Sequence, residues 1–194
     1  MIKLTIIIPV YNEIKTIEKL IKKILKIDIY KQLIIVDDGS SDGTQLVLKK
    51  YKKFINKLII HKKNLGKGAA IKSGQKYVKG KYVGIQDADL EYDPRDLKKI
   101  VNEMDKKKLK VMYGSRVLKK NKFKNTQNFT HIVRIWGNIF LTKVSNFFNK
   151  QQLTDAHTCY KVFDSKIFKK IRLKEKGFSF CPEITTKISM MNLE

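Results

Sequence analysis

The feature that most limits the possible folds of this chain is a fourfold alternation of apolar runs and amphipathic segments before Ser115. The apolar runs are short and rich in β-branched residues, which is typical of parallel strands buried on both faces. Strands that alternate with helices form a mostly parallel sheet covered by helices on both sides. We predict strands at residues 4–10, 33–36, 58–60, 82–85 and 111–113, and helices at residues 14–25, 41–51, 69–78 and 94–104.

The rest of the chain is less regular. We predict a lysine-rich, mobile loop at 119–128, an amphipathic helix at 131–148, a strand at 158–163, a helix at 165–171, and a loop from 178 that leads into a helix ending near 191. The helix at 131–148 has two interpretations. It packs against the domain, or it lies on a membrane with its apolar face down and lysines toward anionic head groups.

The composition excludes several classes of protein. Of 194 residues 42% are hydrophobic, so the chain is not a disordered polycation. No apolar stretch approaches the roughly 18 residues that cross a bilayer. Two cysteines are too few for a disulfide framework, which favours a reducing, cytoplasmic compartment.

The net charge of +24 results from 42 Lys and Arg residues against 18 Asp and Glu residues. Of the 42 basic residues, 4 are arginines and 38 are lysines. Lysines spread along the whole chain favour a basic background over a specific nucleic-acid site.

Polar clusters follow the first, second and fourth predicted strands. In open parallel sheets, ligands bind beyond the carboxyl ends of the strands. Asp87-Ala88-Asp89 follows the fourth strand, and two carboxylates there suit Mg²⁺ or Mn²⁺, which take oxygen ligands together with substrate phosphates. Glu91 either adds a third ligand or stays solvated.

The other clusters suit a nucleotide or serve the fold. Asp38 can accept a hydrogen bond from a nucleobase or a ribose, whereas Ser41 or Asp42 can cap the following helix. Tyr11 offers a ring for a base to stack on. The turn at 64–68 does not match a P-loop, but Lys67 beside a helix start can approach a phosphate.

Four motifs occur in a specific order: PVYNE, DDGSSDGT, NLGKGAA and QDADLEYDP. Together with Gly114-Ser115-Arg116 and the stretch TDAHTCYKVF, they resemble the family 2 glycosyltransferases with a GT-A fold. The resemblance is greatest to the branch of dolichyl-phosphate and undecaprenyl-phosphate sugar transferases, and it covers residues 4–188. It implies a Rossmann-like α/β domain in which residues 1–116 bind a nucleotide sugar and residues 117–194 form the acceptor side.

The resemblance also implies roles for individual residues. The nucleotide of the donor contacts Pro9, Tyr11, Glu13, Val36 and Asp38, while Asp87, Ala88 and Asp89 form the donor and metal motif, with Asp89 the stronger ligand. Glu91 stands where relatives often have Gln, so its metal role stays open. Arg116 matches a basic residue near the transferred sugar or the acceptor phosphate, and Arg134 is the candidate for a second one.

The implied reaction is an inverting, metal-dependent transfer of a hexose from a UDP- or GDP-sugar to a polyprenyl phosphate, by a protein peripheral to the inner face of the cell membrane. A lipid phosphate is already an anion, so it needs cationic positioning by Arg116 and Arg134 more than a base. A sugar hydroxyl as acceptor, in cell-surface glycan synthesis, requires a base, for which Glu183 and Asp155 are candidates. The QxxRW motif of processive synthases is absent from the sequence.

Two further alternatives stay open. Relatives continue past the position of Glu194 with a segment that bears more basic residues, so we expect a C-terminally truncated acceptor region. An inactive nucleotide-sugar-binding fragment is the alternative that follows from this expectation. The charge alone motivates a polyanion-binding protein, whose affinity falls steeply with salt. The three histidines are not at metal-ligand spacing, and we interpret them as structural or surface groups.

Overall fold

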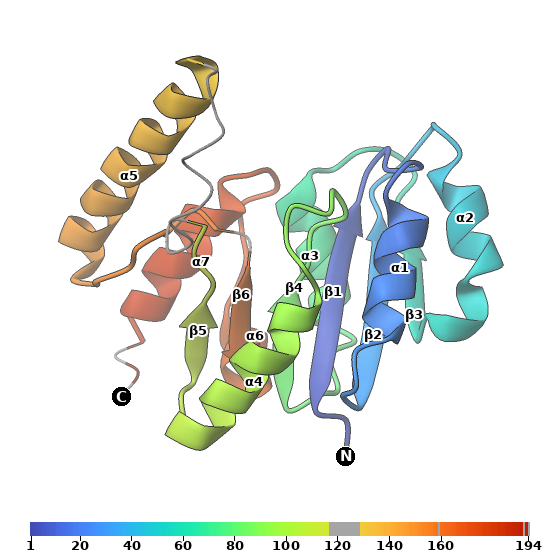
Figure 1. Ribbon diagram of the computed structural model, residues 1–194, viewed down its shortest axis with the longest axis horizontal. Coiled ribbons are helices and arrows are strands. Elements are labelled where there is room, and N and C mark those ends of the chain that lie inside the picture. The colour runs from blue at the N-terminus through green and yellow to red at the C-terminus, as the bar shows by residue number, and fades with distance from the viewer. Residues whose placement is uncertain (117–128, 159, 192, 194) are drawn as a thin grey trace.

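The computed structural model describes residues 1–116, 129–158, 160–191 and 193, without the side chains of 129–135. The loop predicted at 119–128 lies outside these residues. Within them, six strands form one mixed sheet in the order β3-β2-β1-β4-β6-β5 (Figure 1). The strands are β1 (Leu4–Val10), β2 (Lys31–Asp37), β3 (Lys57–Ile60), β4 (Tyr82–Ile85), β5 (Val111–Tyr113) and β6 (Lys161–Asp164).

The helices cover both faces of this sheet, as the alternation predicts. They are α1 (Ile17–Leu25), α2 (Thr44–Lys50), the short 3-10 helix η1 (Lys52–Phe54), α3 (Lys67–Gln75), α4 (Arg95–Lys107), α5 (Phe129–Asn149), α6 (Ser165–Lys170) and α7 (Phe180–Ser189). Helices α1, α2 and α4 pack on one face of the sheet, whereas α3, α6 and α7 pack on the other. The predicted α/β class with a mostly parallel sheet is confirmed.

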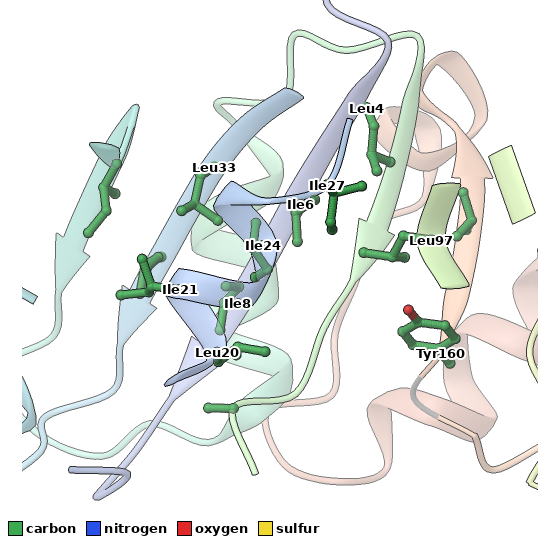
Figure 2. Packing of buried hydrophobic residues seen from close by; sticks show 14 of the residues in the cluster. Leu4, Ile6, Ile8, Leu20, Ile21, Ile24, Ile27, Leu33, Leu97 and Tyr160 are labelled. Atoms are coloured by element: carbon green, nitrogen blue, oxygen red, sulfur yellow. The ribbon is translucent and has the colours of Figure 1, made fainter. Parts of the chain in front are cut away.

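Strand β1 is the centre of the core because both of its faces are buried. Ile6 and Ile8 pack beneath α1, with Leu20 and Ile24 of that helix lying over them (Figure 2). Ile7 points to the opposite face and joins a second cluster with residues of α3 and α7. The apolar side chains on both faces of β1 therefore have partners, which explains why the strand is almost entirely apolar; the one polar residue, Thr5, is buried and donates to Gln32.

Strand β6 differs from the simple alternation. It lies between β4 and β5 and runs antiparallel to both, with Val162 opposite Gly84 and Met112. The second part of the chain therefore supplies a strand to the same sheet. Its observed bounds begin three residues later than the predicted strand at 158–163.

The first helix also begins later than the predicted residue 14. The backbone N–H of Ile14 donates to a carboxylate oxygen of Asp42 at 3.0 Å, so Ile14 belongs to the turn after β1. Its side chain is 42% exposed. Apolar spacing alone placed Ile14 on the helix, and a tertiary hydrogen bond decided otherwise. No helix within the described ranges is long and apolar enough to cross a membrane.

The packing of α1 on β1 predicts a large difference between two isoleucines. Ile24→Ala removes a fully buried side chain and should lower the free energy of unfolding by about 2 to 5 kcal/mol. Ile14→Ala is the matched control and should cost less than about 1 kcal/mol, because Ile14 lies outside the helix. Urea unfolding followed by circular dichroism measures both; equal losses would contradict the packing described.

Candidate functional site

A cavity of about 270 Å³ opens at the carboxyl ends of β1, β2 and β4. Eight of the residues predicted from the sequence line it: Pro9, Tyr11, Glu13, Asp38, Lys67, Asp87, Ala88 and Asp89. The parallel pairing explains this, because Val10 lies opposite Asp37 and the β4 chain continues into the acidic pair beside the end of β1. The four sequence motifs meet at one site.

Hydrogen bonds tie the turn after β1 to the turn after β2. Asn12 has a positive φ of 53°, and its backbone N–H donates to the Ser40 hydroxyl at 2.9 Å. Its side-chain oxygen accepts from the backbone N–H of Ser41, also at 2.9 Å. Asp42 accepts from the backbone N–H of Thr44 at 2.9 Å, but the N-cap residue of α2 is Gly43 rather than the predicted Ser41 or Asp42. The cavity wall is therefore fixed by local polar contacts.

Asp38 holds the turn that precedes α3. Its buried carboxylate accepts from the backbone N–H groups of Leu65 at 3.0 Å and Gly66 at 2.7 Å. It also lies 2.6 Å from Nδ1 of His61, whose other ring nitrogen contacts Ser73. His61 is thus a structural group. Asp38 lines the cavity and also anchors its wall, so a nucleotide contact would share an oxygen that already has partners.

Two glycines let chain segments come close together here. Gly39 has a φ of 78°, and a Cβ on it would lie 2.6 Å from the backbone carbonyl carbon of Lys63. Gly66 has a φ of 95°, and a Cβ there would lie 2.4 Å from the carbonyl oxygen of Lys176. Side chains are excluded at both positions. Gly39 therefore allows the close approach of another loop.

Lys67 forms an ion pair with Asp87 inside the cavity. The ammonium nitrogen lies 2.5 Å from Oδ1 of Asp87, and both side chains are largely buried. Lys67 comes from the start of α3 and Asp87 from the end of β4, so the pair joins two walls. An ammonium and a carboxylate at this point form the charge pattern that a divalent cation and a diphosphate would complement.

The acidic pair fits a divalent cation, but only as a partial site. Asp87 and Asp89 both line the cavity, and Oδ1 of Asp89 accepts from the backbone N–H of Glu91 at 2.9 Å. Glu91 does not line the cavity; its carboxylate lies 3.9 Å from Nη1 of Arg116. The described residues contain no cluster of three or more His, Cys, Asp or Glu side chains suited to a metal. Two carboxylates completed by substrate phosphates are the usual arrangement for Mg²⁺.

Arg116 is held by Asp155 beside this site. Nε lies 2.8 Å from Oδ2 and Nη2 lies 3.0 Å from Oδ1, so the pair is bidentate. Asn138 of α5 donates to the same carboxylate at 3.1 Å. Burial works to raise the pKa of Asp155, but the hydrogen bonds and charge of Arg116 outweigh it and hold the pKa below 3.8. The hydrogen bond to Asp155 in turn raises the pKa of Arg116.

Neither candidate base is a free carboxylate. Asp155 is engaged by Arg116, and its lowered pKa makes it a weak proton acceptor. Glu183 accepts from the backbone N–H groups of Lys174 at 2.7 Å and Glu175 at 3.0 Å and pairs with Lys187. Burial raises the pKa of Glu183, but these partners together lower it. Both carboxylates stabilise the fold around the site.

Two predicted site residues have other surroundings. The Val36 side chain is fully buried in the core cluster beneath α3, so only its backbone belongs to the strand end. Arg134 lies in α5, but its side chain is outside the described residues.

Gly177 and Phe178 line the cavity although the sequence did not assign them to it. The backbone N–H of Ala69 donates to the carbonyl oxygen of Lys176 at 3.1 Å, which holds this loop against α3. The glycines at 66 and 68 were the available signal, because close approach to them leaves room only for another backbone.

The sequence pattern of the family described as Glycosyl transferase family 2 matches residues 5–172, which is most of the chain. The chain belongs to this family. The family resemblance read from the four motifs is confirmed, and it places the chain among the glycosyltransferases.

Two of the similar proteins carry names that specify a lipid phosphate. The chain is 24% identical over 189 residues to the dodecaprenyl-phosphate galacturonate synthase of Rhizobium johnstonii, covering 93% of this chain and 53% of that protein. It is 27% identical over 209 residues to the UDP-N-acetylglucosamine–dolichyl-phosphate N-acetylglucosaminyltransferase of Methanococcus voltae, covering 97% and 81%. The chain thus spans about half the length of the Rhizobium relative.

Among solved structures, glucosyl-3-phosphoglycerate synthase from Mycobacterium tuberculosis in complex with Mn²⁺, UDP and phosphoglyceric acid is similar, with a TM-score of 0.71 and 16% identity. The match covers 98% of this chain and 64% of that one. At this identity the likeness shows the fold, which is the GT-A fold predicted.

The Arg116–Asp155 pair predicts a pH-dependent loss of stability. Asp155→Asn should lower the free energy of unfolding at pH 7 by about 2 kcal/mol, less than for a fully buried pair because the Arg116 side chain is 32% exposed. The pKa of Asp155 is lower in the folded protein than its ordinary value of 3.8, which we take for the unfolded chain. The stabilisation by the Arg116–Asp155 pair is therefore fully present at pH values well above 3.8, and it is lost as the pH falls through the pKa of Asp155 in the folded protein. The difference from the wild type should therefore shrink below about pH 4.

Urea unfolding at several pH values measures this difference. Asp28→Asn is the matched control, because the Asp28 side chain is 99% exposed. It should change the free energy of unfolding by less than about 0.5 kcal/mol. If the difference in free energy of unfolding between Asp155→Asn and the wild type grew toward low pH, it would contradict the predicted role of the ionised Asp155 side chain.

Proposed function

We propose that this protein is an inverting glycosyltransferase that moves a hexose from a UDP- or GDP-sugar to a polyprenyl phosphate. The observation that carries the proposal is the cavity in which Asp87, Asp89 and Lys67 meet the turns after β1 and β2. Residues 1–116 bind the donor and residues 117–194 form the acceptor side. The named relatives that act on dodecaprenyl and dolichyl phosphate support this choice of acceptor.

In this proposal each cavity residue has a role toward the donor. Tyr11 stacks on the base, while Pro9, Glu13, Ala88 and the backbone at Val36 shape its pocket. Asp38 contacts the nucleoside from the wall that it anchors. Asp87 and Asp89 hold Mg²⁺ or Mn²⁺, which supplies Lewis-acid stabilisation of the departing diphosphate. Lys67, which pairs with Asp87 in the structure, would contribute its positive charge to binding the phosphates.

The acceptor side favours a phosphate over a hydroxyl. Arg116 is held rigidly by Asp155 and presents a charged guanidinium near the acidic motif, as a phosphate nucleophile requires. Arg134 is the second proposed cation. Asp155 and Glu183, the candidate bases for a sugar hydroxyl, are both committed to other contacts. The proposal places the protein peripherally at the inner face of the cell membrane, where the acceptor phosphate lies.

Donor binding in the presence of metal tests the acidic motif. Calorimetry with UDP- and GDP-sugars and Mn²⁺ should show binding that Asp89→Ala weakens about tenfold or more, because a metal ligand is lost. Glu91→Gln should leave the affinity within about twofold, since Glu91 lies outside the cavity. Asp28→Ala controls for the loss of one negative charge. Equal effects of Asp89→Ala and Glu91→Gln would contradict the assignment.

The acceptor is tested by transfer. Radiolabelled donor is offered with polyprenyl phosphate or with oligosaccharides, and the product is divided between organic and aqueous phases. Label should move to the organic phase only with polyprenyl phosphate. Arg116→Ala should abolish most of this transfer while donor binding persists. Transfer to oligosaccharide alone would favour the hydroxyl-acceptor alternative.

A further inference from the structure

Helix α5 packs against the domain through its polar face. Asn138 donates to Asp155, and the Thr142 hydroxyl accepts from the backbone N–H of Ala156 at 3.2 Å. Asn146 both donates to and accepts from the backbone of Leu153, at 2.8 and 3.0 Å. These residues are four apart, so they form one stripe along the helix. Thr142 is only 4% exposed, which marks this stripe as the buried one.

The opposite stripe of α5 is apolar and faces away from the domain. An offset of two residues turns the helix by about 200°, so residues two positions before or after the polar stripe lie on the far side. Trp136 is 68% exposed and Phe147 is 80% exposed. The outward stripe consists of Trp136, Phe140, Val144 and Phe147, all exposed. Phe148 is exposed as well, but it borders a cavity that residues of β5 and α7 also line. Figure 1 shows α5 on the outside of the molecule, beyond β5 and α7.

This orientation is the reverse of an ordinary surface helix, which buries its apolar stripe. Of the two interpretations of this helix, packing of the apolar face against the domain is therefore excluded for the described side chains. A contiguous exposed stripe of large aromatic residues marks an interaction surface. Its composition, aromatic rings with Lys143 on the same side seven residues after Trp136, suits a helix that lies in a membrane interface.

We propose that the outward stripe of α5 docks on the surface of an anionic lipid bilayer. The net charge of +24 complements acidic head groups. The same charge opposes a second copy of this chain as the occupant, because two such chains repel each other. Lipid acyl chains accept the aromatic side chains, and the helix needs no polar partner because its polar stripe is already bonded to the domain.

A consequence that rests on the proposed transferase function concerns Arg116. The polar stripe of α5 reaches Arg116 through Asn138 and Asp155, so Arg116 lies on the side of the helix that faces away from the docked stripe. A docked helix would hold this guanidinium one helix diameter, roughly 10 Å, from the bilayer surface, within reach of a phosphate that projects from a lipid acceptor. The docking itself needs neither donor nor acceptor, so the two proposals are tested separately.

Trp136 provides a direct probe because it is the only tryptophan of the chain. Its fluorescence is recorded with vesicles of phosphatidylglycerol and phosphatidylcholine that contain no polyprenyl phosphate, and with vesicles of phosphatidylcholine alone. With the anionic vesicles the emission should move to shorter wavelength and be quenched by brominated acyl chains. An emission spectrum unchanged by anionic vesicles, or a spectral change without quenching, would overturn the proposal.

The stripe is tested by paired variants that keep Trp136. Phe140→Ser with Phe147→Ser should lower the affinity for anionic vesicles roughly tenfold or more in a flotation assay. Tyr30→Ser with Leu46→Ser, two exposed apolar residues outside α5, should change it less than about twofold. Equal losses in both pairs would overturn the proposal. The proposal would also be overturned if the wild-type protein did not bind vesicles but formed a dimer in sedimentation analysis, and if the Phe140→Ser, Phe147→Ser double variant were a monomer.

Discussion

The parallel pairing of β1 with β2 and β4 is the constraint on which the rest of this structure depends. It buries both faces of β1, which requires the continuous apolar run and the helices on either side. It also brings three carboxyl strand ends to one edge of the sheet, so polar residues far apart in sequence face one cavity. Stability and site location follow from the same pairing.

Charge within that cavity is arranged before any ligand binds. Asp38 is committed to His61 and to the turn before α3, and Asp87 is paired with Lys67. Asp89, at the exposed rim, is the carboxylate with the least protein contact of the three and so the most accessible to a cation. The few acidic residues define the site, whereas the excess of lysine describes the surface around it.

Much of the fold and most of the cavity could be predicted from the sequence, because both depend on short-range patterns. Apolar periodicity identified the strands, and the polar strand ends together with the family resemblance identified eight cavity residues. Tertiary contacts decided the rest. Ile14 left the predicted helix because Asp42 binds its N–H, and Phe178 reached the cavity through a loop held by Ala69. The sequence could not show that α5 is bonded to the domain through its polar stripe. An amphipathic pattern shows that a helix has an apolar and a polar face, but it does not show which of the two faces contacts the domain.

The most direct test of the central claim is anomalous diffraction from crystals that contain Mn²⁺ and UDP or GDP. A manganese peak is expected between Asp87 and Asp89, with the diphosphate beside it and Lys67 moved away from Asp87 toward a phosphate. A peak at Glu91 or elsewhere on the molecule, or a nucleotide bound outside the ends of β1, β2 and β4, would contradict that claim.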